Sequence, residues 1–190
     1  ASQEITAAND GAVLSKLLQI SAGWVYTADR SIVSLDNDNR LDALSDAVAS
    51  TDAKVLVFVP FVHALAGLAA RLEQDGVDVR TVSGDTPKGE RDEIFRLFQN
   101  TDRVRAIVAH PQCMAHGLTL TSADTIIWAS PTTSLEIFEQ ANARIRRIGQ
   151  TKKQQILMFQ ATDAERRMYA RLRAKQKVQN VLLEMFAENS

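Results

Sequence analysis

Hydrophobic positions along the chain change their spacing several times, and each change predicts a new element. Segments with apolar residues at helical spacing, or with helix-start signals, are predicted helices, at 7–21, 39–50, 61–74, 86–99 and 134–145. Short apolar or alternating runs are predicted strands, at 54–59, 77–82, 105–109, 125–129 and 155–159. Strands that alternate with helices predict an α/β fold with a mostly parallel sheet covered by helices on both faces.

The ends of the chain add helical extensions to this core. We expect a short extended connection over 23–36 and a long last helix from Asp163 to about Ala187. Thr86 can cap the helix that follows it, and Pro87 suits the first turn of that helix. An apolar stripe is predicted on the last helix, at Met168, Leu172, Val178, Leu182 and Phe186. We divide the single compact domain into an N-terminal helical extension (1–53), a core (54–160) and a C-terminal helix (161–190).

Composition excludes some classes of protein. The longest apolar run, Val55–Val62, is broken by Pro60 and is far shorter than the ~20 residues of a membrane span. The N-terminus has no signal-peptide pattern, and it also lacks an initiator Met, which indicates processing or truncation. One cysteine, Cys113, forbids an intramolecular disulfide and fits a reducing compartment such as the cytoplasm.

Charge is distributed unevenly although the net charge is only −1. Residues 144–177 hold eleven of the 22 basic residues and two acids, so this segment carries +9 and the rest of the chain −10. A local basic surface of this kind suits phosphate groups, and an ordinary solvated helix face explains it equally well.

The string Q-A-N-A-R-I-R-R-I-G-Q at 140–150 is the strongest chemical signal. Arg144 and Arg147 are three residues apart and share a face of a helical turn, with Gln140 one turn earlier. Two guanidinium groups that point the same way suit a phosphate whose charge grows in a transition state. Gly149 lets the chain leave the turn.

This string resembles motif VI of superfamily-two helicases, in the form found in Swi/Snf-type DNA translocases. Three further stretches resemble family motifs in the right order: Lys54–Phe58 (motif IV), Gly84–Pro87 with the helix after it, and His116–Asp124 (motif V). The resemblance covers roughly Lys54 to Phe159. The H-P-x-x-x-x-H-G-L and Q-A-N-A-R variants are most similar to phage or prophage members.

The resemblance implies that the fold is the second RecA-like lobe of a two-lobed motor. It implies that Arg147, and with it Arg144, are arginine fingers, and that Gln140 supports the same ATP interface. Gly117 in motif V is implied to link the ATP cleft to the DNA groove. The implied partners are an N-terminal RecA-like lobe of the same protein, which holds most of the ATP and Mg²⁺, and DNA, in the cytoplasm of a bacterial or phage-infected cell.

Departures from the family pattern concern DNA contacts more than ATP contacts, because motif VI is intact. His110 and Pro111 stand where the family often has Ser-Thr, Met114-Ala115 replaces Gly-Gly, and Thr119 replaces Asn. We expect contacts to the backbone of duplex DNA, without sequence preference. The candidate DNA-binding residues are His110, Gly84, Arg166, Arg167 and Arg171.

Two helicase motifs are missing from the sequence. It contains neither a G-x-x-x-x-G-K-[ST] phosphate loop nor a D-E-x-[HDQ] metal-binding motif. We therefore expect the C-terminal half of a longer ATPase that is inactive as an isolated fragment. The alternative is a stand-alone, non-catalytic RecA-like module that binds nucleic acid or protein. A Rossmann-type enzyme is disfavoured because the glycine-rich dinucleotide turn is missing.

A metal site is not predicted. His110, Cys113 and His116 are spaced like soft-metal ligands, but a fourth ligand is missing nearby in the sequence. Cys113 is expected to pack as a small hydrophobic residue.

Overall fold

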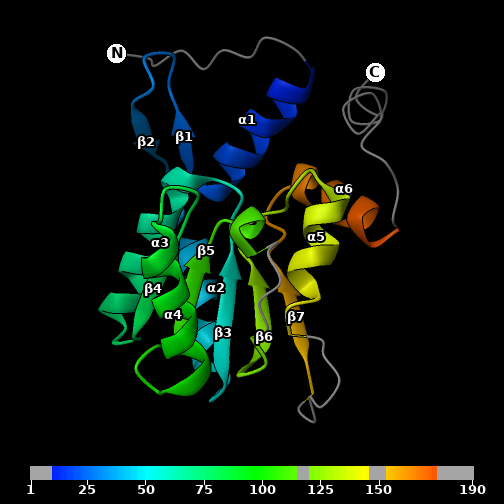
Figure 1. Cartoon of the computed structure of the whole chain (residues 1–190). Helices are drawn as coiled ribbons and strands as arrows, with labels where there is room; N and C mark the ends of the chain where they lie inside the picture. The colour runs from blue at the N-terminus through cyan, green and yellow to red at the C-terminus, as the bar shows by residue number, and fades with distance from the viewer. Residues whose placement is uncertain (1–9, 115–119, 146–152, 175–190) are drawn as a thin grey trace.

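The computed structural model describes residues 10–114, 120–145 and 153–174 (Figure 1). The helices are α1 (Asp10–Ala22), α2 (Asp38–Ala49), α3 (Val62–Gln74), α4 (Lys88–Asn100), α5 (Leu135–Asn142) and α6 (Asp163–Arg173), with a 3-10 turn, η1 (Pro111–Met114). The strands are β1 (Trp24–Tyr26), β2 (Ile32–Ser34), β3 (Lys54–Phe58), β4 (Val79–Val82), β5 (Ala106–Ala109), β6 (Ala123–Trp128) and β7 (Gln155–Met158). None of the described helices is long and apolar enough to cross a membrane.

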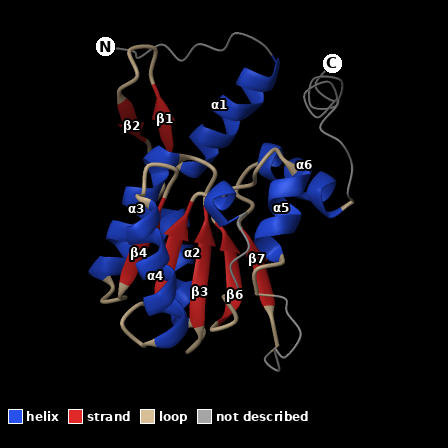
Figure 2. Ribbon diagram, in the orientation of Figure 1, coloured by secondary structure: helices blue, strands red, loops and turns tan. Residues whose placement is uncertain are grey.

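Five strands form one parallel sheet in the order β4-β5-β3-β6-β7, with helices on both faces (Figure 2). The central strand β3 pairs Leu56 with Ile107 of β5 and with Ile126 of β6. The predicted α/β fold with a covered parallel sheet is therefore confirmed.

The strand β3 explains why the sheet needs a layer of helices on each face. Its residues from Val55 to Phe58 have no exposed surface. Alternate side chains enter opposite cores: Leu56 and Phe58 pack among α1, α4, α5 and α6, whereas Val55 and Val57 pack among α2 and α3. A run of apolar residues without alternation is thus what a strand buried on both faces requires.

The segment predicted as a simple connection is a β-hairpin. Strands β1 and β2 pair antiparallel, with Tyr26 opposite Ile32. Each strand has three residues, which is too short for alternation to show in the sequence. The hairpin packs on α3 through Trp24: a Cβ atom placed on Gly67 would lie 2.3 Å from the indole, so only glycine leaves room for it.

One predicted helix start is corrected, and one predicted helix end lies outside the described residues. Thr86 does not cap α4; its hydroxyl accepts a hydrogen bond from the Ser83 amide (2.9 Å), and Pro87 takes the N-cap position without a side-chain bond. The last helix is described only as far as Arg173. The rest of its predicted length, 175–187, lies outside the described residues.

A buried polar network joins the helices α2 and α6 to the end of strand β6. Arg40 of α2 forms an ion pair with Glu165 of α6 (2.7 Å), and both side chains are almost fully buried. Arg40 also donates to the carbonyl of Ala129, just after β6. The second oxygen of Glu165 accepts hydrogen bonds from the amides of Ala161 and Thr162, just before the first residue of α6. Both charges therefore have partners inside the protein.

We expect Arg40→Met to lower the free energy of unfolding by about 3–5 kcal/mol, because it leaves the Glu165 carboxylate buried without its counter-ion. Adding Glu165→Gln to this variant should restore part of the loss, since it removes the buried charge. Urea unfolding followed by circular dichroism measures both. Arg96→Met is the matched control: Arg96 pairs with Glu93 on the surface, where such pairs contribute about 0–1 kcal/mol. Equal losses in Arg40→Met and Arg96→Met would contradict this role.

A half-buried histidine makes stability depend on pH. Burial lowers the pKa of His63; its hydrogen bond to the Trp24 carbonyl (2.9 Å) opposes this shift, and the charge of Lys16 adds to it. Around pH 6.5 the unfolded chain thus binds more protons at this residue than the folded chain does. The free energy of unfolding should therefore fall as the pH drops below about 6.5.

His63→Gln should reduce the dependence of the free energy of unfolding on pH below about 6.5. The glutamine amide can still donate to the Trp24 carbonyl, but it does not titrate. Some pH dependence should remain, since burial also lowers the pKa of His110. Urea unfolding between pH 5 and 8 measures the slope. Identical slopes for the variant and the original chain would show that His63 is not responsible.

Candidate functional site

Helix α5 carries the first half of the motif VI string. Its N-cap Ser134 accepts a hydrogen bond from the amide of Ile137 (3.3 Å), which fixes where the helix begins. Phe138, Ala141 and Ile145 follow at helical spacing and are buried in the core. The core-facing side of α5 therefore decides which residues remain on its outer side.

Gln140, in α5, and Arg144, in the turn after it, are partly buried and share one flank. Ala143 keeps a helical conformation and the Arg144 amide donates to the Ala141 carbonyl (3.2 Å), so the helical turn continues through Arg144. Four residues on a helix are about 40° apart, which places Gln140 and Arg144 on one flank. The Gln140 amide donates to Glu136 (2.9 Å) on the same flank.

The structure thus brings two of the four predicted ATP-site residues together. The other two, Arg147 and Gly117, lie outside the described residues. The motif V segment nevertheless has one described link to this flank, since the Leu120 amide donates to the carbonyl of Arg144 (3.4 Å).

Asn142 has a role that the sequence analysis missed. Its side-chain oxygen accepts a hydrogen bond from the indole N–H of Trp128 (2.9 Å), and both residues are buried. This bond ties α5 to the end of β6 from inside the core. A polar residue on the apolar side of a predicted helix signals a buried partner, and Trp128 was the nearby candidate.

A surface groove of about 460 Å³ lies beside the carboxyl ends of β4 and β5. It brings together Gly84 and His110, two of the predicted DNA-binding residues, although they are distant in sequence. It also contains Arg91, which the sequence analysis did not propose. The remaining lining residues are Val62, Gln112 and Cys113.

Two helices begin close to this groove without a side-chain cap. Val62 lines it as the first residue of α3, and Arg91 lines it from the first turn of α4. Neither N-cap residue, Phe61 or Pro87, makes a side-chain hydrogen bond to its helix. The first amides of a helix carry partial positive charge, so uncapped N-termini beside Arg91 suit an anionic group.

His110 is a neutral part of this groove. Burial lowers the pKa of its imidazole, and a hydrogen bond with the Pro60 backbone opposes this shift. Its Nδ1 atom accepts a hydrogen bond from the Gln112 amide (3.3 Å), so this nitrogen carries no proton in that arrangement. His110 can therefore contribute a polar ring at neutral pH, while Arg91 contributes the charge.

Cys113 is buried, and burial raises the pKa of its thiol. His116, the third member of the predicted ligand spacing, lies outside the described residues. Within the described ranges, no three His, Cys, Asp or Glu side chains gather as a metal site would require.

The structure does not place the three arginines of α6 on one surface. Arg171 is buried, with 8% of its surface exposed, so it does not extend the predicted DNA face. Arg166 and Arg167 are more accessible, and both pair with Asp163 (3.2 and 2.7 Å). The helical stripe that buries Met168 and Leu172 also turns Arg171 inward, which charge patterning alone could not reveal.

Comparisons with known proteins agree with this fold. Residues 39–149 match the family described as helicase conserved C-terminal domain. Protein CHROMATIN REMODELING 19 of Arabidopsis thaliana is 30% identical over 125 residues, which are 66% of this chain and 16% of that protein. The SWI/SNF-related regulator of chromatin subfamily A-like protein 1 of Xenopus tropicalis is 29% identical over 111 residues, 58% of this chain and 12% of that protein.

The relative named "Putative helicase 172L" comes from Invertebrate iridescent virus 6. It is 30% identical over 103 residues, 54% of this chain and 17% of its own length. The chain thus spans less than a fifth of each of these relatives. The expected likeness to phage members in particular stays a prediction.

Solved structures show the same fold. The C-terminal part of the Fun30 ATPase domain superposes with a TM-score of 0.65 at 24% identity, over 77% of this chain and 50% of that one. The C-terminal domain of the DEAD-box protein Dbp5 gives 0.63 at 16% identity, over 73% and 79%. The matched family region starts in α2 and includes the strands β3 to β6, the groove and α5, but not β7. The chain therefore belongs to the helicase conserved C-terminal domain family, and its fold is that of a C-terminal RecA-like lobe.

Proposed function

We propose that this lobe completes the ATP site of a DNA translocase and supplies part of its DNA-binding surface. The observation that carries the proposal is that Gln140 of α5 and Arg144 in the turn after it share one flank, while Phe138, Ala141 and Ile145 are fixed in the core. A helix held in this way can offer a guanidinium group to a phosphate on another lobe.

ATP and Mg²⁺ would be held mainly by the first lobe, because this sequence contains no phosphate loop and no acidic metal-binding motif. Arg147 and Arg144 would then act on the γ-phosphate from across the cleft. A planar guanidinium group can form two parallel hydrogen bonds to phosphate oxygens, and its charge counts most when negative charge builds in the transition state. Gln140 would support the interface from the same flank.

The groove at the carboxyl ends of β4 and β5 would bind the DNA backbone. Its features are Arg91, the uncapped starts of α3 and α4, and the neutral ring of His110. These groups recognise phosphate rather than base edges, so binding would not depend on sequence. Because Asp163 already pairs with Arg166 and Arg167, we assign α6 a secondary role at most.

The chain offers a direct route between the two surfaces. His110 and η1 lie at the groove, and the same segment returns to Leu120, whose amide bonds to the carbonyl of Arg144. DNA bound at His110 would contact one end of the segment 110–120, and a phosphate bound at Arg144 would lie next to its other end. Gly117, which lies between His110 and Leu120 in the sequence, is proposed to link the ATP cleft to the DNA groove.

In the full-length protein, Arg147→Ala and Arg144→Ala should leave ATP binding nearly unchanged and lower the rate of hydrolysis. Loss of an arginine finger typically slows turnover by about 10³-fold or more, because the residue acts on transition-state charge. Arg147→Lys should also fail, since a point charge does not replace the planar fork. Steady-state ATPase assays with saturating DNA give kcat, and nucleotide titrations give affinity.

Arg146→Ala is the matched control, because helical spacing predicts that Arg146 lies off the face shared by Arg144 and Arg147. It should keep kcat within a few fold of the original protein. The isolated 190-residue chain should show no DNA-stimulated hydrolysis in the same assay. A normal kcat in Arg147→Ala would remove this residue from the ATP interface, and activity of the isolated chain would contradict the division between two lobes.

Arg91→Gln should weaken DNA binding by the full-length protein equally for unrelated sequences. Each lost phosphate contact should flatten the slope of log K against log salt by about 0.9 on duplex DNA. Arg96→Gln is the control on the same helix, since Arg96 is exposed and pairs with Glu93. Fluorescence anisotropy at several salt concentrations measures both variants. If the Arg91 variant keeps the original slope, the groove does not hold a phosphate at this residue.

A further inference from the structure

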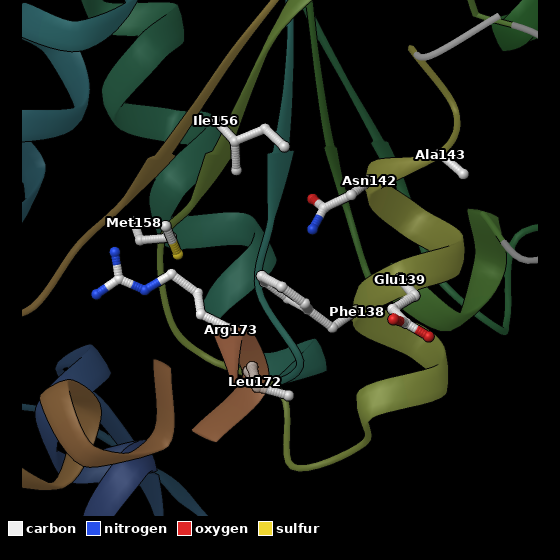
Figure 3. A pocket seen from close by; sticks show the side chains of 8 residues that line it. All are labelled: Phe138, Glu139, Asn142, Ala143, Ile156, Met158, Leu172 and Arg173. Carbon is white, nitrogen blue, oxygen red and sulfur yellow. The ribbon is translucent and has the colours of Figure 1, made fainter. Parts of the chain in front are cut away.

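The hydrogen bond between Trp128 and Asn142 lies on the core side of α5, opposite the flank with Arg144. Asn142 is the last residue of α5, and Arg144 follows two residues later in the turn. At about 100° per residue, these two residues lie on nearly opposite sides of the helix axis. Figure 3 shows the side chains of Asn142 and Phe138 projecting from α5 toward the side of strand β7. Asn142 thus holds the inner side of the helical turn that carries Arg144 on its other side.

The chemistry of the two side chains fixes the direction of this hydrogen bond. An indole N–H donates and cannot accept, so the atom of Asn142 that faces it must be the oxygen. The distance from Nε1 of Trp128 to Oδ1 of Asn142 is 2.9 Å; Trp128 has no exposed surface, and Asn142 exposes 8%. A buried donor without a partner is unfavourable, so the bond selects one position for the Asn142 side chain.

Trp128 is itself held from several directions. Its ring packs against the rings of Phe58 and Phe138, with centroids 5.2 and 5.0 Å away. Its carbonyl accepts hydrogen bonds from the Phe159 amide (3.0 Å) and the Tyr169 hydroxyl (3.1 Å). These contacts come from β3, α5, the end of β7 and α6. The indole N–H therefore points toward α5 from a fixed position at the end of β6.

Apolar packing alone restricts the rotation of α5 less sharply than this bond does. Phe138, Ala141 and Ile145 make apolar contacts in the core, and such contacts have no preferred direction. A hydrogen bond weakens when its angle is distorted, so it opposes rotation of the helix about its axis. Side chains end about 5–6 Å from the axis, so a rotation of about 10° moves the Arg144 side chain by about 1 Å. A displacement of about 1 Å can slow a reaction by about 10²-fold.

We propose that Asn142 and Trp128 are positioning residues of the ATP site, because their hydrogen bond fixes the rotation of α5 and thereby the position of Arg144. The proposal rests on the proposed function, in which Arg144 meets the γ-phosphate. Both residues act through Arg144 rather than on the nucleotide. A bond that only stabilises the fold would affect turnover only as far as it affects stability, and this difference can be measured.

The test compares three variants of the full-length protein. Asn142→Leu removes the acceptor and should lower kcat by about tenfold or more, while ATP affinity stays nearly unchanged. Asn142→Asp keeps an oxygen in the same place, so it should retain most of kcat although its buried carboxylate lowers the melting temperature. Tyr169→Phe is the matched control, because it removes a different buried hydrogen bond to Trp128 and leaves α5 untouched. It should lower the melting temperature and keep kcat within about twofold of the original protein.

Steady-state ATPase assays with saturating DNA, nucleotide titrations and thermal melts measure these quantities. A normal kcat in Asn142→Leu would overturn the positioning role. An equal loss of kcat in Tyr169→Phe would reduce the bond to a stabilising contact, and an equal loss in Asn142→Asp would show that the acceptor oxygen is not what matters. Either result would therefore also overturn the proposal.

A combination with Arg144→Ala separates the positioning role from the proposed function. If Asn142 acts through Arg144, adding Asn142→Leu to Arg144→Ala should cost no further kcat. A further loss as large as in Asn142→Leu alone would overturn the positioning role and leave Arg144 in the ATP site. A normal kcat in Arg144→Ala alone would instead refute the proposed role of Arg144, and the positioning role with it.

Discussion

Burial of the central strand on both faces is the constraint from which the rest of this lobe follows. A strand without an exposed side must have a paired strand on each edge and a helical layer above and below it. Alternate residues of β3, Leu56 and Val57 among them, therefore supply two separate cores. Because parallel pairing aligns all carboxyl ends along one edge, the loops after β4 and β5 meet there and form the groove with Gly84 and His110.

The same constraint explains which parts of the fold were predictable. The five core strands and six helices follow from hydrophobic spacing, because each is long enough to show a period of two, a continuous apolar run, or a helical repeat. The β1–β2 hairpin was not predictable in this way, since three residues per strand show no period. Its position depends instead on Trp24 and Gly67, which lie on separate elements and carry no local signal.

The candidate site also contains residues that the sequence could place and residues that it could not. Gln140 and Arg144 could be placed on one flank because their spacing on a single helix is sufficient. Arg91 joins Gly84 and His110 only through the strand order, and its place in the groove could not be deduced from spacing. Arg171 was assigned to the surface from its charge, whereas the packing of α6 buries it. Charge predicts exposure on average, but the helical face of a residue decides it.

The close fit of Trp24 against Gly67 joins the hairpin, which precedes the region shared with the helicase family, to a helix inside that region. Any larger residue at position 67 would force the indole or α3 to shift. The residues at positions 24 and 67 therefore constrain each other. Related lobes that keep glycine at this point of α3 can accommodate the same hairpin, and those with a bulkier residue there must have built their N-terminal extension differently.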